Sequence, residues 1–186
     1  MLKNGLIALV SLVVTWAAHA DKSFEESELT ALSACGENKK AQLLAKLVKE
    51  DPDQLRSSLS CNQKLTSIAQ QKAEEMAEAG EVSHHGVGGY PDQRLIEGGY
   101  NLKLPEGVGL EGNHVEAVQG GSSRAEDILS KFKNSYQHRV HLFGEHSFFL
   151  EQDEIGVGYA YNWNSPHVDY WVVYIASRAE PENGTE

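Results

Sequence analysis

Positive charge is scarce in this sequence of 186 residues. It contains 16 Lys and Arg against 27 Asp and Glu, which gives a formal net charge of −11 at pH 7. Because nucleic-acid binding needs clustered basic side chains, this balance argues against a nucleic acid as partner. Long apolar runs are scarce as well. Beyond residue 20 no stretch of about 18 residues is apolar, so we expect no membrane anchor of the helical kind.

The longest apolar run lies at the N-terminus and is typical of a signal peptide. Lys3 precedes the apolar stretch 6–14, and Ala18-His19-Ala20 forms a small-x-small cleavage site. We therefore expect residues 1–20 to be removed and the rest of the chain to be exported, either to the periplasm or to the medium. At about 150 residues per domain, the exported part has room for one domain.

Cysteine is also rare, with only Cys35 and Cys61 in the chain. In an oxidising compartment an even pair of cysteines favours a disulfide, and two buried free thiols are the alternative. A bridge between these positions would stabilise the fold by roughly 3.5 kcal/mol through the loop that it closes.

Polar flanks set the expected domain boundaries. Residues 21–37 are polar and acidic and predict a loosely held N-terminal arm, and residues 179–186 predict a polar tail. The domain proper is expected over residues 38–178. Within it, apolar residues at helical spacing predict a first helix from Asn38 to about Lys49, which Pro52 follows.

Two further helices have start signals in the sequence. Ser60-x-x-Gln63 resembles a capping box at the start of the strongest helix, which Gly80 ends. Ser123-x-x-Glu126 is a second such pattern and opens another helix. Between these helices, residues 83–121 are rich in glycine and predict a long loop, interrupted only by a short helix over about 91–97.

The last third of the chain alternates with the period of a strand. Residues 155–161 alternate bulky and small side chains, and the small ones would let another element approach closely. Residues 170–177 are apolar on both faces, which indicates a central strand covered on both sides. Helices followed by an antiparallel meander predict an α+β layered domain.

Histidine is concentrated in one part of the chain. Six of the seven histidines after residue 20 lie in a single segment: His84, His85, His114, His138, His141 and His146. Such clustering suggests a metal site or an acid–base site, although a single histidine is more often a surface or packing residue. No HExxH, GxSxG, GxGxxG or P-loop motif accompanies the cluster.

Four stretches together resemble the CAP superfamily, or SCP domains, which includes cysteine-rich secretory proteins, antigen 5 and pathogenesis-related proteins. Their order and spacing are most similar to the short bacterial members. The stretches are Leu59 to Ala77, Ser83-His84 with Gly89, Arg94 and Gly99-Tyr100 beyond it, Ser135-Tyr136-Gln137-His138-Arg139, and Ile155 to Tyr159 followed by Tyr170-Trp171-Val172. The resemblance implies a three-layer α-β-α sandwich with an antiparallel central sheet.

The resemblance also implies a cleft that contains two histidines and a glutamate. His84 and His138 match the two histidine positions. Glu116 is the preferred glutamate because Gly121 follows five residues later, although Ala117 stands where the family has asparagine. The second glutamate of many eukaryotic members has no counterpart in this chain.

Two alternative ligands stay open in the sequence. His85 directly follows His84, and Glu111 lies close to Asn113. Two imidazoles and one carboxylate are ordinary ligands for Zn²⁺ with an open fourth position. The implied site is therefore a metal site formed by His84, Glu116 and His138, for Zn²⁺ or another divalent metal.

The resemblance implies an exported module whose cleft holds a metal weakly and binds a ligand or partner beside it. That partner is a lipid, a small molecule or a protein. The alternative is a metal-dependent hydrolase, in which His138 or Glu116 acts as general base on a metal-bound water. A third hypothesis is a scaffold whose histidine cluster no longer has a function.

Overall fold

The computed structural model describes residues 32–180. The predicted signal peptide, residues 21–31 of the arm and residues 181–186 of the tail lie outside the described residues. None of the helices formed by residues 32–180 has the length and apolar character of a membrane span.

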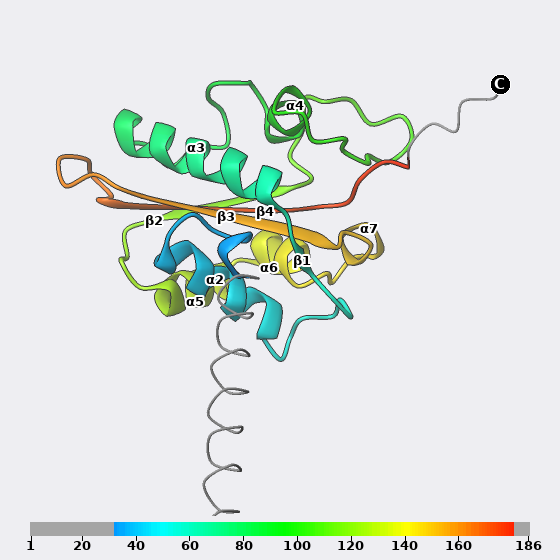
Figure 1. Cartoon of the computed structure of the whole chain (residues 1–186), viewed down its shortest axis with the longest axis horizontal. Coiled ribbons are helices and arrows are strands. Elements are labelled where there is room, and N and C mark those ends of the chain that lie inside the picture. Colours follow the sequence, from blue (N-terminus) through cyan, green and yellow to red (C-terminus); the bar gives the residue numbers. More distant parts are fainter. Residues whose placement is uncertain (1–31, 181–186) are drawn as a thin grey trace, which may run out of the picture. The chain divides into compact units, whose positions relative to one another are not determined.

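A four-stranded sheet forms the middle layer (Figure 1). Its strand order is β1-β3-β4-β2. The strands span Ser60–Cys61 (β1), Glu116–Gly120 (β2), Glu154–Tyr161 (β3) and Asp169–Ala176 (β4). The pairs β3–β4 and β4–β2 are antiparallel, whereas β1 is parallel to β3. The expectation of an antiparallel sheet is therefore wrong at the β1 edge. The chain between β1 and β3 runs through several helices and β2, so these two strands are not joined by a hairpin.

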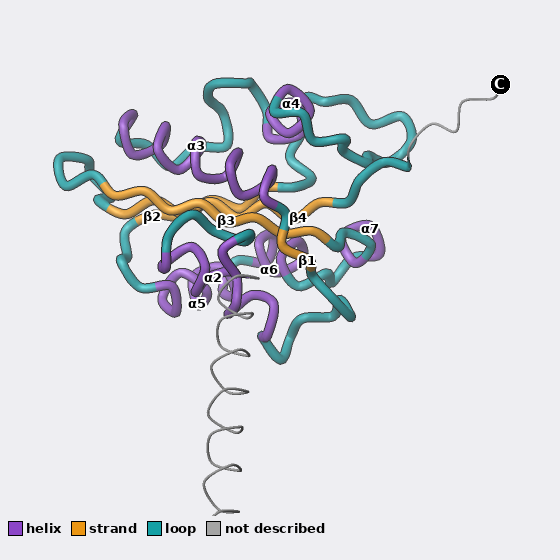
Figure 2. Tube along the Cα trace, in the orientation of Figure 1, coloured by secondary structure: helices purple, strands orange, loops and turns teal. Residues whose placement is uncertain are grey.

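Helices cover both faces of the sheet, which confirms the predicted sandwich (Figures 1 and 2). On one face lie α3 (Gln63–Ala79) and α4 (Pro91–Glu97). On the other face lie α2 (Lys39–Glu50), α5 (Ala125–Asn134) and α6 (Tyr136–Leu142). A single turn of helix, α7 (Ser147–Leu150), precedes β3. Each face has its own buried apolar cluster, so the sheet separates two cores.

As predicted, the small residues of β3 let another element approach closely, and β4 is covered on both sides. A Cβ atom on Gly156 would overlap the backbone of α3 at Leu65 and Thr66, and one on Gly158 would overlap Ala69. Glycine at these two positions therefore lets α3 pack directly on the sheet. All residues of β4 are buried. Its side chains point alternately into the two cores, as predicted for a central strand.

Both predicted capping boxes are wrong in detail. The N-cap of α3 is Asn62, whose side chain accepts hydrogen bonds from the backbone of Lys64 and Leu65. Ser60 cannot serve as cap because it pairs with β3 as part of β1. The N-cap of α5 is Arg124, which makes no side-chain cap. By contrast, Gly80 ends α3 in the left-handed conformation with φ of 72°, as predicted.

The glycine-rich segment contains a strand that its composition does not predict. β2 forms within the predicted loop and pairs with β4 along Glu116–Gly120. Two of its five residues, Glu116 and Gln119, are polar and one is glycine, so no alternating apolar pattern marks it. Pairing with the fully buried β4 supplies the stabilisation that the local sequence lacks.

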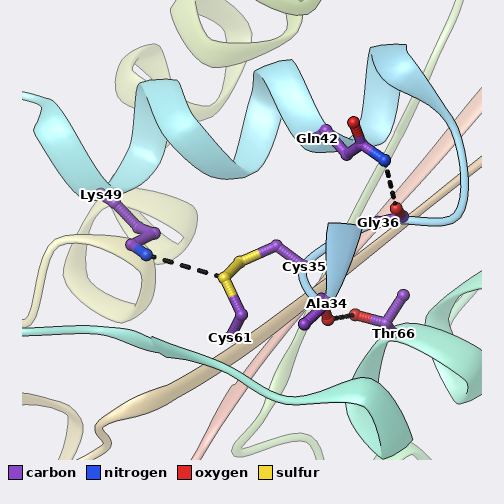
Figure 3. Close-up of a disulfide and its surroundings, with 7 residues drawn as sticks. All are labelled: Ala34, Cys35, Gly36, Gln42, Lys49, Cys61 and Thr66. Atoms are coloured by element: carbon purple, nitrogen blue, oxygen red, sulfur yellow. Dashed lines mark hydrogen bonds between the residues drawn. A yellow bond between two sulfur atoms is a disulfide. The ribbon is translucent and has the colours of Figure 1, made fainter. Parts of the chain in front are cut away.

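The predicted disulfide between Cys35 and Cys61 is confirmed (Figure 3). It fixes the described end of the N-terminal arm, which was expected to be loosely held. The carbonyl of Cys35 accepts a hydrogen bond from Val157 of β3, and that of Ala34 accepts one from Thr66 Oγ1 at 2.7 Å. Residues 34–36 are thus attached to both the sheet and α3.

Candidate functional site

A pocket of about 440 Å³ lies where α6 approaches the segment that leads into β2. Its wall combines polar side chains with apolar and aromatic ones. The lining residues are His84, Asn113, Glu116, Tyr136, Gln137, His138, Val140, His141 and Phe149. The pocket therefore joins three parts of the sequence: the loop after α3, the start of β2, and the segment from α6 to α7.

Glu116 is the buried centre of a hydrogen-bonded group beneath this pocket. Its side chain is fully buried. One carboxylate oxygen, Oε1, lies 2.8 Å from Nδ1 of His84. The other, Oε2, accepts hydrogen bonds from Arg94 Nη1 at 2.8 Å and from the Tyr174 hydroxyl at 2.5 Å. Both oxygens are therefore engaged by protein groups.

Arg94, on α4, connects Glu116 to the loop that carries His84. Its guanidinium also donates to the backbone carbonyls of His84 at 3.0 Å, Val87 at 3.0 Å and Gly89 at 3.1 Å. Burial opposes the charge of Arg94, yet the neighbouring Tyr174 and Glu116 raise its pKa above the ordinary value. Arg94 is thus a fixed cation that neutralises Glu116 and holds the His84 loop in position.

Tyr174 completes the buried group from β4. Burial, followed by the charge of Glu116, raises the pKa of Tyr174 well above its ordinary range. The phenol is therefore neutral and donates its hydrogen bond to Glu116.

Asn113, which is exposed to solvent, holds the backbone of Glu116. Its Oδ1 accepts from the backbone N–H of Glu116 at 2.9 Å, and its Nδ2 donates to the backbone carbonyl of Glu116 at 3.0 Å. The same Nδ2 lies 3.2 Å from Nδ1 of His84. The sequence patterns predict no role in the site for Arg94, Asn113 or Tyr174. Arg94 belongs to a stretch that carries the family resemblance, and Asn113 lies close to Glu111, whereas Tyr174 lies within an apolar strand and has no signal of its own.

The tautomer of His84 follows from its partner. Because the carboxylate of Glu116 can only accept, Nδ1 of His84 carries the hydrogen between them. In the neutral imidazole the other ring nitrogen, Nε2, has the lone pair, and it has no hydrogen-bond partner within residues 32–180. The side chain of His84 is 39% exposed and lines the pocket.

His138 lies on α6, in more apolar surroundings than His84. Its ring packs edge-on against Phe132, with 5.0 Å between the ring centroids. Nδ1 of His138 is buried and has no hydrogen-bond partner among the described residues. Burial, and to a smaller degree the charge of His84, lowers the pKa of His138. The imidazole of His138 is therefore neutral near pH 7.

His141, one turn further along α6, is a core residue. It is only 6% exposed, and Nε2 lies 3.4 Å from the carbonyl of Ile175. Burial, together with the charge of Arg56, lowers the pKa of His141 to about 3. This histidine reaches the pocket wall but is held by the core.

The structure brings together the three preferred site residues and leaves the two alternatives outside. His84, Glu116 and His138 all line the pocket. His85 and Glu111 are exposed and do not line it.

A family model described as CAP, the cysteine-rich secretory protein family, matches residues 55–175. The chain belongs to this family. Among solved structures, an outer surface protein from Borrelia burgdorferi is similar to the CAP domain described here, with a TM-score of 0.56. The match covers 74% of this chain and 90% of that protein at 17% sequence identity, which shows a shared fold. Comparison with curated proteins gave no match.

The donor set of this CAP domain does not fit the three-ligand metal site that the resemblance implies. Within residues 32–180, no group of three His, Cys, Asp or Glu is arranged to hold a metal ion. Glu116 is neutralised by Arg94 and orients His84, which is the role of a carboxylate behind a ligating histidine. Nδ1 of His138 has no such partner. The metal site stays a prediction.

The pocket of this CAP domain also lacks the usual nucleophiles of covalent catalysis. The residues that line it include no Ser, Thr or Cys. A general base needs a free lone pair near its substrate. Of the two residues expected in that role, His138 and Glu116, Glu116 already accepts hydrogen bonds from three groups.

Proposed function

We propose that this CAP domain is an exported binding module and that its ligand occupies the pocket between His84 and His138. The hydrogen bonding of Glu116 carries this proposal. Because Arg94, Tyr174 and His84 occupy both carboxylate oxygens, Glu116 acts as a fixed support and presents one face of His84 to the pocket. Preorganised polar groups beside apolar walls are typical of ligand sites.

Binding is better supported than hydrolysis by the same contacts. Hydrolysis through a metal-bound water would need Glu116 as a ligand or His138 as a base. Glu116 is paired with Arg94 at 2.8 Å, and His138 has no carboxylate or carbonyl to orient it. Neither residue has the environment that tunes a catalytic base. The metal-assisted and hydrolytic hypotheses stay predictions.

Export of the chain is supported by two observations. Disulfides persist in oxidising compartments, and this chain forms one between Cys35 and Cys61. The similar fold from Borrelia burgdorferi belongs to an outer surface protein. We therefore place the binding module outside the cytoplasm, in the periplasm or the medium.

A fragment screen by ligand-observed NMR tests the proposed binding site. Gln137 is exposed and lines the pocket, so Gln137→Trp should fill the pocket without disturbing the core. Gln63, at the start of α3, is an exposed glutamine that does not line this pocket, and Gln63→Trp is the matched control. We expect fragments that bind the wild-type protein and Gln63→Trp but not Gln137→Trp. Binding that Gln137→Trp leaves unchanged, or no binding fragment at all, would contradict the proposal.

A further inference from the structure

We infer that this pocket works without a metal and recognises a neutral amide group, through an acceptor at Nε2 of His84 and a donor at Nε2 of His138. The inference rests on the proposed function, because it names the ligand class of the same pocket. It follows from the surroundings of the two imidazoles, which differ although both rings line one cavity.

The acceptor is set by Glu116. Nδ1 of His84 donates to Oε1 at 2.8 Å, and Arg94 and Tyr174 hold the other oxygen in place. The carboxylate cannot rotate away without breaking these bonds. A neutral His84 held in this tautomer has its lone pair on Nε2, and its side chain is partly exposed and lines the pocket.

The donor is set by the missing partner of His138. Nδ1 of this residue is buried without a hydrogen bond, beside the ring of Phe132. An N–H buried in this way would cost about 1–3 kcal/mol, and such orphaned N–H groups are rare in folded proteins. The neutral ring therefore keeps its lone pair at Nδ1 and its hydrogen at Nε2, the nitrogen on the other side of the ring.

This tautomer of His138 conflicts with metal binding. To coordinate a metal through Nε2, His138 would have to move its hydrogen to the buried Nδ1, where no acceptor lies. Metal-bound histidines usually donate that hydrogen to a carboxylate or a carbonyl. His84 has such a partner in Glu116, but His138 does not.

The ligand class follows from one acceptor and one donor in a pocket whose one carboxylate is paired with an arginine. Glu116 is the only Asp, Glu, Lys or Arg in the lining, and it is paired with Arg94. An amide supplies both an N–H for His84 and a carbonyl for His138. A carboxylate supplies acceptors only and would face the lone pair of His84. Val140, Phe149 and the exposed ring of Tyr136 offer apolar surface for the substituent of the amide.

The tautomers can be measured directly. Long-range ¹H–¹⁵N correlation spectra of chelator-treated protein with ¹⁵N-labelled histidine distinguish Nδ1–H from Nε2–H, and His84→Phe and His138→Phe assign the signals. We expect Nδ1–H in His84 and Nε2–H in His138. Nδ1–H in His138 would overturn the inference, because that nitrogen would then donate to the Phe132 ring and leave Nε2 as an acceptor.

Three small probes test the ligand class on the same chelator-treated protein. Phenylacetamide and N-methylphenylacetamide carry a primary and a secondary amide, and phenylacetate is the carboxylate of nearly the same shape. We expect at least one amide to shift the signals of both His84 and His138 and to bind at least about tenfold more tightly than phenylacetate. His84→Phe and His138→Phe should lose this binding, whereas His167→Phe, at an exposed position in the β3–β4 turn, should keep it.

The outcomes distinguish the possible sources of the amide. They also distinguish a failure of the amide inference from a failure of the proposed function. Binding of phenylacetamide alone indicates a free primary amide or an Asn or Gln side chain, and binding of N-methylphenylacetamide indicates a peptide backbone. Tighter binding of phenylacetate, no amide binding, or shifts that require added Zn²⁺ would overturn the amide inference. If fragments of another class still bind in a Gln137-dependent way, the proposed function survives. If no fragment binds, the proposed function fails as well.

Discussion

Two histidine–carboxylate pairs in this CAP domain depend on the same short helix, α4, and look alike at first. Nδ1 of His84 lies 2.8 Å from Glu116, which Arg94 of α4 holds. Nδ1 of His114 lies 2.6 Å from Asp92, which belongs to α4 itself. Both carboxylates are fully buried, and the imidazoles are 39% and 30% exposed. Distance and burial therefore do not tell the two pairs apart.

The groups around each pair do tell them apart. Asp92 also accepts the backbone N–H of His114 at 2.9 Å, so both of its oxygens attach residue 114 to α4. The ring of His114 packs edge-on against Phe148 and does not line the pocket. Glu116 is instead shared with Arg94 and Tyr174 and supports a ring that faces a cavity. The residues around a histidine–carboxylate pair thus decide whether the pair has a structural role or forms part of a site.

Removing the charge of Glu116 should have the largest effect. In Glu116→Gln the guanidinium of Arg94 stays buried without a carboxylate, and we expect the free energy of unfolding to fall by about 3–5 kcal/mol. Urea denaturation measures this change. Glu111→Gln makes the same substitution at an exposed position and should stay within about 0.5 kcal/mol of wild type. Equal stability of the two variants would mean that Arg94 does not depend on Glu116.

His141 extends the comparison because its imidazole has no carboxylate partner among the described residues. His141 has a folded-state pKa of about 3, below the ordinary value near 6.5, so its neutral form is favoured in the fold. As the pH falls below about 6.5, the unfolded chain binds a proton that the folded chain does not, and stability is lost until the pH approaches 3. The expected loss from this group is about 3 kcal/mol at pH 4.

Denaturation at pH 7 and pH 4 measures that loss. His141→Gln cannot titrate and should lose less stability than wild type over this pH range, even if it is less stable at pH 7. His167→Gln, at an exposed position, should follow the wild-type pH dependence. If His141→Gln and wild type lose equal stability between pH 7 and pH 4, His141 is not buried in the neutral form.

The sequence predicted the parts of the fold that have strong local patterns. The apolar stripe of α3, the end of α3 at Gly80 and the alternation along β3 and β4 all lie as expected. It did not predict β2 or the N-caps at Asn62 and Arg124. β2 depends on its pairing with β4, and the cap of α3 moved because Ser60 pairs with β3. Both depend on contacts distant in sequence.

The same division holds for the pocket. Residues with a motif, His84 and His138, and a glutamate chosen by glycine spacing, Glu116, do line one cavity. The role of Glu116 could not be predicted, because it depends on Arg94, 22 residues away, and Tyr174, 58 residues away. The buried Nδ1 of His138 is likewise a property of packing against Phe132 and has no local signal.

Disrupting the pair of His114 and Asp92 should lower the stability of the fold by a smaller amount. Asp92→Asn keeps an oxygen for the backbone N–H of His114 but loses the charge-assisted bond to its ring, and we expect a loss of about 1–2 kcal/mol in the free energy of unfolding. Phenylacetamide binding should be unchanged, since Asp92 does not line the pocket. A loss of binding in Asp92→Asn without a loss of stability would show that the two pairs act as one site.

Asn113 should give the smallest effect and the sharpest test of how the pocket is oriented. Its amide holds both backbone groups of Glu116, at 2.9 and 3.0 Å, but it is exposed to solvent. Water can replace these bonds in Asn113→Ala, so we expect a loss of only about 0.5–1 kcal/mol in urea denaturation. Asn164→Ala, at an exposed asparagine in the β3–β4 turn, is the matched control and should lose less. Because Nδ2 of Asn113 also lies 3.2 Å from Nδ1 of His84, the His84 signals should shift in Asn113→Ala while the Nδ1–H tautomer is kept. A change of tautomer would mean that Asn113, and not Glu116, fixes the hydrogen of His84.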